Sequence, residues 1–156
     1  MNEAVQEKWG WATATHAMRD EVINALTDAD LAFTPGGDAM TFGALCREMG
    51  EIEKAYADSF KNFTQTFSYR HPDRAVETSV DALKAWFKQL DAEAETAIGA
   101  IEDGQKIIKR DSGYETPVLQ QLEFYLQALL IFLGKATIYL RAMKKPLSSD
   151  MIAWVG

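Results

Sequence analysis

The chain has 156 residues, a net charge of −7 and 47% hydrophobic residues, which suits one globular domain over residues 1–156 with its own core. An acidic chain repels phosphate backbones, so nucleic-acid binding is not expected. The single cysteine, Cys46, excludes an intramolecular disulfide and fits a reducing, cytoplasmic location. The first residues show no signal-peptide pattern, and the longest apolar run, residues 128–133, is far shorter than the roughly 20 residues that span a bilayer. We therefore expect no membrane association.

The first half of the chain predicts two amphipathic helices. The first covers about residues 3–26, and a capped turn follows at residues 27–31 before Pro35-Gly36-Gly37 breaks the chain. The second begins after the cap residue Thr41 and continues to about residue 63. Their stripes at helical spacing are Val5, Trp9, Ala12, His16, Arg19, Ile23 and Leu26, then Phe42, Leu45, Met49, Ile52, Tyr56, Phe60 and Phe63.

The second half predicts two more helices. The third opens at a capping box over residues 78–81 and stops near Gly104. Residues 104–116 are irregular, with a short extended piece at 106–109. The fourth helix begins at Thr116-Pro117, a cap followed by proline at the first helical position, and Pro146 ends it. With a last short turn after residue 148, the chain is predicted to be all-α, an antiparallel-type four-helix bundle with short extra helical turns.

Two of these helices carry a second apolar seam beside the main stripe. The seams are Trp11, Met18 and Val22 on the first helix, and Phe124, Ile131 and Ile138 on the fourth. A helix that is apolar on two faces needs two partners, so we predict a homodimer that buries both seams. The alternative is that the loop over residues 64–76 covers them within one chain.

Polar residues interrupt the apolar stripes. They are His16 and Arg19 on the first helix, Glu48 and Glu53 beside the stripe of the second, and Gln121, Tyr125 and Tyr139 on the fourth. If the first two helices are antiparallel neighbours, Arg19 and Glu48 lie at the same height, because each is about seven residues from the connecting loop. A buried charge must be paired, so we predict an Arg19–Glu48 ion pair with His16 close by.

This polar cluster has two interpretations. Either it is a satisfied contact that sets the helix register, or it is the floor of a ligand pocket in which Glu48 or His16 acts as acid or base. Asp91, Glu93 and Glu95 on the third helix follow each other too closely to face one direction, and they predict a solvated face.

A resemblance to a known family covers most of the chain. Residues 26–31 (LTDADL), Pro35 and residues 41–48 (TFGALCRE), followed by residues 116–146, resemble the DinB-like superfamily in order and spacing. The resemblance implies a four-helix bundle, often dimeric. In many members three histidines hold a divalent metal, one on the second helix and a His-x-x-x-His pair just before a glycine of the fourth. Those members resemble metal-dependent hydrolases or thiol-transferring enzymes.

Carried onto this chain, the three metal positions fall at Glu48, Ala128 and Phe132, counted back from Gly134. Alanine and phenylalanine cannot coordinate a metal, and a single carboxylate cannot hold zinc or nickel against water. We therefore predict no metal and no other cofactor.

Two functions fit these observations. In the first, the protein binds or converts a small molecule without a metal, in a central cavity lined by His16, Arg19, Glu48, Gln121, Tyr125, Ala128 and Phe132. In the alternative, it is a dimeric scaffold without enzymatic activity, or a metal-dependent hydrolase or transferase with a non-standard site. A packed centre would favour the scaffold, and an open cleft that reaches Glu48 would favour binding.

Overall fold

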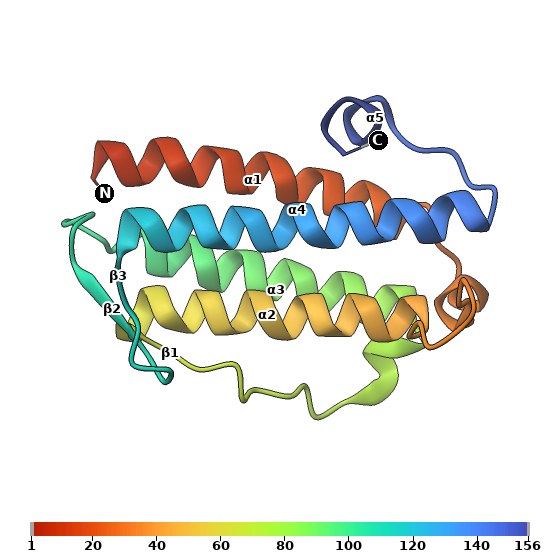
Figure 1. Ribbon diagram of the computed structural model, residues 1–156, viewed down its shortest axis with the longest axis horizontal. Helices are drawn as coiled ribbons and strands as arrows, with labels where there is room; N and C mark the ends of the chain where they lie inside the picture. Colours follow the sequence, from red (N-terminus) through yellow and green to blue (C-terminus); the bar gives the residue numbers. More distant parts are fainter. Residues whose placement is uncertain (1, 156) are drawn as a thin grey trace.

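The computed structural model describes residues 2–155, and four long helices lie side by side along its longest dimension (Figure 1). They are α1 (Glu3–Asn24), α2 (Phe42–Asn62), α3 (Val80–Gly99) and α4 (Val118–Ala142). The short elements are η1 (Asp28–Ala32), η2 (Arg74–Glu77) and α5 (Ser149–Trp154). The predicted all-α four-helix bundle with short extra turns is confirmed.

Side-chain caps begin three of the four long helices, and those of α2 and α3 lie where the sequence predicted them. The predicted cap Thr116 does not cap α4, whose N-cap residue is Pro117. Thr41 accepts a hydrogen bond from the backbone N–H of Ala44, and Ser79 accepts one from Ala82. The side chain of Asn2 caps α1 in the same way. These bonds satisfy N–H groups that have no partner within the helix, which explains why the helices begin there.

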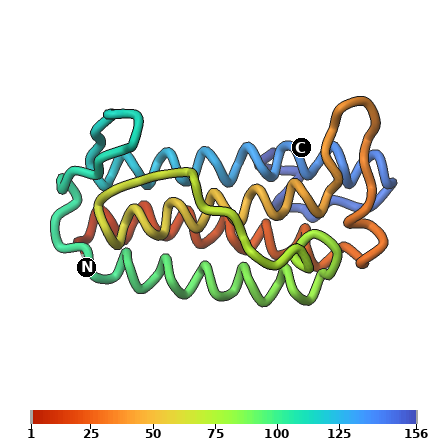
Figure 2. The backbone as a smooth tube through the Cα atoms, turned by 90° about the horizontal axis from the view of Figure 1, so that it is seen from below, coloured from red at the N-terminus to blue at the C-terminus, as the bar shows by residue number. Residues whose placement is uncertain are grey.

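The helix directions correct the predicted antiparallel arrangement. α1 and α4 run in one direction, whereas α2 and α3 run in the other, as the colour gradients of Figure 1 show. Residues 63–79 cross back along the outside of α2 to make this possible (Figure 2). α1 packs against α3 and α4, and α2 packs against the same two helices. α1 and α2 therefore lie on a diagonal of the bundle and are not the neighbours that the predicted Arg19–Glu48 pair required.

A small sheet closes one end of the bundle. β1 (Thr64–Gln65) pairs in parallel with β2 (Ile107–Arg110), which pairs antiparallel with β3 (Glu115–Pro117). The extended piece predicted at residues 106–109 is thus confirmed. The backbone N–H of Lys109 donates to the carbonyl of Phe63, so the ribbon is fastened to the C-terminal end of α2.

The second apolar seams have different surroundings from those predicted. Met18 and Val22 are buried within the chain, where α4 and α5 lie near them, so they are not free to form a dimer interface. Trp11 is half-exposed and contacts Trp154 of α5. The 64–76 loop lies along α2 (Figure 1). Trp11, Ile131 and Ile138 are 50–60% exposed, so the suggestion that this loop covers the seams is wrong.

α4 is the one described helix that is long and apolar enough to cross a membrane. Length and composition alone are weak support for a membrane span. α4 packs against α1 and α2, and it buries Leu122, Leu129 and Leu133 in the core that all four helices share. These contacts are typical of the central helix of a bundle.

The contact between α2 and η2 can be tested at Gly43, with Gly134 of α4 as the comparison. A Cβ added at Gly43 would lie 1.9 Å from the backbone carbonyl oxygen of Glu77, whereas one added at Gly134 meets no atom within 4 Å. We expect Gly43→Ala to lower the free energy of unfolding by about 1–3 kcal/mol, because backbone must move. Gly134→Ala should be neutral or stabilising by up to ~1 kcal/mol through helix propensity. Urea unfolding of both variants measures this, and equal effects would contradict the described contact between α2 and η2.

Candidate functional site

The three positions at which the resemblance would place metal ligands come together in the structure. Glu48 of α2 and Ala128 and Phe132 of α4 line one small hollow of about 130 Å³. The positions carried over from the resemblance are therefore neighbours in the structure. Phe132 is 3% exposed, so its ring fills the space behind this hollow.

This hollow does not fit a divalent metal. Ala128 and Phe132 offer no donor atom, and the Oε1 atom of Glu48 lies 3.5 Å from the Nζ atom of Lys135. An ammonium group at that distance supplies the positive charge beside the carboxylate, and it would repel a metal ion. The residues present replace a metal site by a lysine–glutamate ion pair and an aromatic ring.

Glu48 also lies on a larger open cleft of about 600 Å³. The cleft lies between α2 and the crossover segment, and it is lined by Met40, Ala44, Arg47, Glu48, Glu51, Ile52, Phe67, Arg70 and Glu77. Met40 and Phe67 are 41% and 43% exposed, which leaves apolar surface open in the cleft. The cleft that would favour binding therefore reaches Glu48 from outside the bundle and not through its centre.

Ion pairs hold the walls of this cleft in place. The Arg47 guanidinium donates from Nε to Glu51, from one terminal nitrogen to Glu77 and from the other to the carbonyl of His71 at 2.8 Å. Glu51 also accepts a hydrogen bond from the backbone N–H of His71 at 3.0 Å. The hydrogen bond from Arg47 lowers the pKa of Glu77. The crossover is thus fixed to α2, and the cleft is formed before any ligand arrives.

The centre of the bundle holds a second polar cluster, built around Arg19 of α1. One terminal nitrogen of Arg19 lies 2.7 Å from Glu53 Oε2, and the two terminal nitrogens lie 3.0 and 2.8 Å from the carboxylate oxygens of Asp91. Asp20 accepts from Nε and from the second terminal nitrogen. All the guanidinium nitrogens are therefore bonded, although the side chain is fully buried.

The predicted Arg19–Glu48 ion pair is wrong. Glu53 follows Met49 by four residues and precedes Tyr56 by three, so it lies on the core stripe of α2, whereas the Glu48 side chain is 41% exposed on the flank. Equal height along the bundle did not identify the partner of Arg19, because α1 and α2 lie on a diagonal and are not neighbours. The spacing of Glu53 from Met49 and Tyr56 is the signal that identifies the partner.

The assignment of Asp91 to a solvated face is also wrong. Asp91 binds Arg19 through both oxygens, and its Oδ1 lies 3.2 Å from His16 Nδ1. It follows the buried Phe87 by four residues, which places it on the inner side of α3. Glu95, by contrast, is exposed as predicted.

His16 joins this cluster to α4. Its Nε2 lies 2.7 Å from the Tyr125 hydroxyl, and burial, reinforced by the Arg19 charge, lowers the pKa of His16 to about 4. The ring is therefore neutral at neutral pH. Asp91 beside Nδ1 favours the tautomer with the proton on Nδ1, which leaves Nε2 as an acceptor beside the Tyr125 hydroxyl. That hydroxyl also lies 3.3 Å from Glu53 Oε2, to which it can donate.

Glu53 is the least compensated member of the cluster. It is 1% exposed, and its Oε1 has no hydrogen-bond partner within residues 2–155. Burial raises the pKa of Glu53 to about 7, against the opposing effect of Arg19. One guanidinium thus serves three carboxylates, and the most buried of them holds a proton most readily.

His16, Glu53 and Asp91 offer ligand atoms within 4.8 Å of one another, which is a spacing that can hold a metal ion. Arg19 already bonds both carboxylates, and its charge would oppose a divalent cation there. The cluster therefore contains its own cation. We interpret it as an internal ion network that connects the helices.

The predicted seven-residue pocket consequently divides into three places. His16, Arg19 and Tyr125 belong to the closed central network, and Gln121 binds Arg110 and Ser59 near the sheet. Glu48, Ala128 and Phe132 line the outer hollow. The two candidate acid–base residues, His16 and Glu48, do not share a site.

Comparison with known proteins agrees with the architecture. No protein-family model and no curated protein sequence matches the chain. Among solved structures, the crystal structure of a mutant mycothiol-dependent maleylpyruvate isomerase superposes with a TM-score of 0.65 at 16% sequence identity. The match covers 89% of this chain and 67% of that one. The chain has the DinB-like fold. Identity this low shows the fold alone, so the activity of this DinB-like bundle rests on its own residues.

The protonation of Glu53 makes a testable prediction. Its pKa is about 7 in the folded chain and about 4.5 as a free side chain, so the folded state binds more protons between these values. Stability from this group is present at low pH and is lost as pH rises through about 7. We expect Glu53→Gln to gain stability relative to the parent chain as pH rises from 5 to 7, as urea unfolding would measure.

Glu95→Gln, which removes an exposed carboxylate of α3, is the matched control and should show no such trend. A constant difference between parent and Glu53→Gln across this pH range would mean that Glu53 is ionised throughout, and the prediction would fail.

Proposed function

We propose that this DinB-like bundle binds a small organic molecule in the cleft beside Glu48, and that it does so without a metal. The observation that carries the proposal is a preformed cleft of about 600 Å³ that reaches this carboxylate. Sites for small molecules have volumes of roughly 300–1,000 Å³ and are mostly formed before binding. The two family positions on α4 that lack donor atoms support the metal-free part of the proposal.

The charges of the cleft indicate the kind of ligand. Arg47 is bonded to Glu51, Glu77 and the carbonyl of His71, so these charges are committed to the wall. Within residues 2–155, Glu48 has one ion pair, at 3.5 Å with the half-exposed Lys135. A ligand with an ammonium or another hydrogen-bond donor can replace Lys135 at this carboxylate, while its apolar part contacts Met40 and Phe67.

Benzylamine is a suitable probe, because it combines an ammonium with an aromatic ring. We expect it to shift the backbone NMR signals of residues around Glu48, and Glu48→Gln to weaken its binding about three- to tenfold. That range is typical of one partly exposed charged contact. Glu95→Gln serves as the control and should bind like the parent chain. Binding that is unchanged in Glu48→Gln, or signals that shift elsewhere, would overturn the proposal.

Metal content tests the other half of the proposal. Protein purified without a chelator should contain zinc, nickel and iron well below one atom per chain. A stoichiometric metal that is lost in Glu48→Ala would show that the hollow holds a metal after all.

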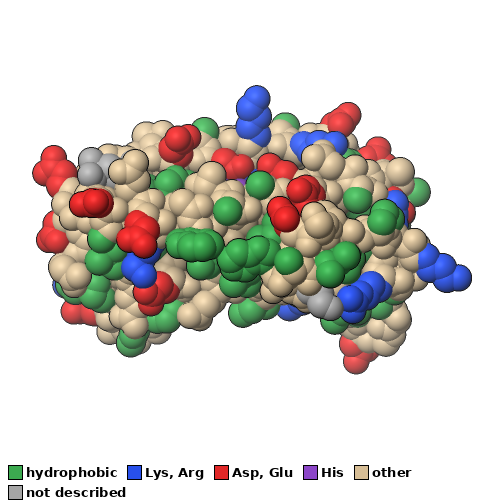
Figure 3. All heavy atoms as spheres, turned by 90° about the horizontal axis from the view of Figure 1, so that it is seen from above, with side chains coloured by type: hydrophobic (Ala, Val, Ile, Leu, Met, Phe, Trp, Pro, Cys, Tyr) green, Lys and Arg blue, Asp and Glu red, His purple; other side chains and the backbone are tan. Residues whose placement is uncertain are grey.

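We also propose that the chain forms a homodimer, which retains the scaffold role as a second candidate function. Ile131 and Ile138 of α4 are each 60% exposed and lie two helical turns apart, and Trp11 is 50% exposed. Hydrophobic side chains gather in the middle of one face of the molecule, between charged groups (Figure 3). With Met18 and Val22 buried and Phe124 half-buried, the proposed interface depends on Ile131 and Ile138.

Light scattering tests this interface. The parent chain should have twice the mass of one chain at micromolar concentration, and the double variant Ile131→Asp, Ile138→Asp should be monomeric. Ile152→Asp, at an equally exposed isoleucine of α5, should stay dimeric. A monomeric parent chain would exclude the dimer.

A further inference from the structure

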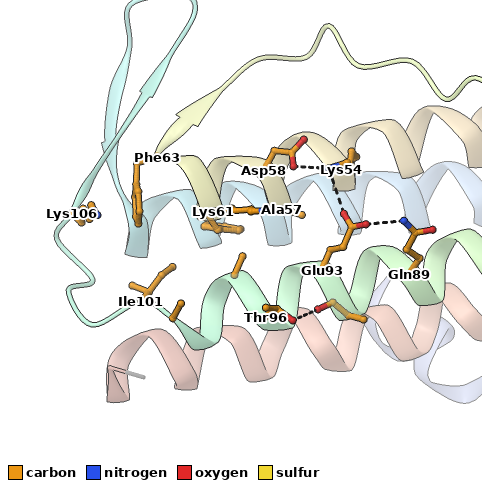
Figure 4. Close-up of a pocket in the computed structure, with 14 residues that line it drawn as sticks. Lys54, Ala57, Asp58, Lys61, Phe63, Gln89, Glu93, Thr96, Ile101 and Lys106 are labelled. Carbon is orange, nitrogen blue, oxygen red and sulfur yellow. Dashed lines mark hydrogen bonds and ion pairs between the residues drawn. The ribbon is translucent and has the colours of Figure 1, made fainter.

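A second cavity, of about 760 Å³, lies between α2 and α3 near the ends of both helices, and it shares no lining residue with the Glu48 cleft (Figure 4). We propose that this cavity, the α2–α3 groove, binds an amphipathic organic anion, that is, a carboxylate or sulfonate with an apolar body. The argument rests on the shape of the groove, its closed end and its charges.

Small side chains keep the groove open. Ala57 of α2 faces α3, where the lining residues include Ala92, Ala97 and Ala100. Interiors are normally packed to the density of organic crystals, so larger residues at these positions would fill the space between the helices. The apolar floor beneath is completed by the buried side chains of Phe60 and Ile101.

Phe63 closes one end of the groove in an unusual backbone conformation. It follows the last residue of α2 with a φ of 56°, in the left-handed region that bulky residues rarely adopt. Its ring lies at the end of the groove, opposite the labelled Lys106 (Figure 4), whose Nζ is 3.4 Å from the ring centroid. A single left-handed residue is a common way for a helix to end, and here it places the phenylalanine ring at the end of the groove.

The charges around the groove are not balanced. At the end far from Phe63, Lys54 pairs with Asp58 and, at 3.4 Å, with Glu93, so this lysine is compensated (Figure 4). Lys61 and Lys106 both line the groove, and neither has a carboxylate within ion-pair distance among residues 2–155. Two uncompensated ammonium groups on a chain of net charge −7 mark this end of the groove as the place for an anion.

The two features together define the ligand class. An anionic head at the Phe63 end of the groove gains charge-assisted hydrogen bonds from Lys61 and Lys106, and an apolar body lies along the alanines. A purely apolar ligand would leave the lysines unused. A cation of the same shape would meet two like charges.

The probe is 8-anilinonaphthalene-1-sulfonate, an aromatic sulfonate whose fluorescence rises on binding, displaced by octanoate. We expect one saturable site, and we expect the double variant Lys61→Gln, Lys106→Gln to weaken octanoate binding about tenfold. Ala100→Phe, at the exposed C-cap position that follows α3, should fill the groove and abolish binding without disturbing the core. Lys84→Gln, at an exposed lysine of α3 outside the groove, should bind like the parent chain.

Octylammonium, with the same chain length and the opposite charge, should not displace the probe. The proposal is overturned if octylammonium competes as well as octanoate, or if the double variant binds like Lys84→Gln. It is also overturned if Ala100→Phe, shown by circular dichroism to be folded, retains octanoate binding. Loss of benzylamine binding in Glu48→Gln would leave all of these results unchanged, so the two sites are tested separately.

Discussion

The buried charge of Arg19 is the constraint on which the arrangement of the four helices depends. A guanidinium in the core must keep its hydrogen bonds, because an unpaired buried charge is strongly destabilising. Arg19 of α1 therefore requires Glu53 of α2 and Asp91 of α3 at the same level. His16, one turn away, adds Tyr125 of α4. A shift of any one helix along the bundle would break at least one of these bonds, so the network specifies the register of all four.

The same network explains why the centre of this bundle is not a ligand site. Arg19, Glu53 and Tyr125 are each no more than 1% exposed, and their polar atoms mostly bond one another. Arg19 supplies the positive charge at the centre, and Phe132 fills the space behind Glu48. Among residues 2–155, a ligand can therefore bind only on the outer surface of the bundle, and both proposed sites lie there.

The fold was predictable because its signals are local. Helical spacing, the caps at Thr41 and Ser79, and the proline at residue 117 depend on neighbours in sequence. Which side chains pair between helices depends on which helices are adjacent, and local sequence patterns do not specify that adjacency. Arg19 was correctly expected to be buried and paired, but its partners follow from the diagonal placement of α1 and α2. The groove beside Phe63 was missed entirely, since neither a left-handed backbone at a phenylalanine nor a space between alanines has a pattern in the sequence.

One face of α2 connects the two proposed sites and explains why their charges differ. Residues 47, 51, 54, 58 and 61 follow one another by three or four positions, so they lie along one side of the helix. They form Arg47–Glu51 and Lys54–Asp58 ion pairs, each spaced four residues apart. The next lysine, Lys61, would need a carboxylate at residue 65, but α2 ends at Asn62 and the chain enters β1. The alternating basic and acidic residues on this side of α2 therefore end with a lysine. The end of the helix leaves Lys61 without a carboxylate partner among residues 2–155, at the place where the alanines open the groove.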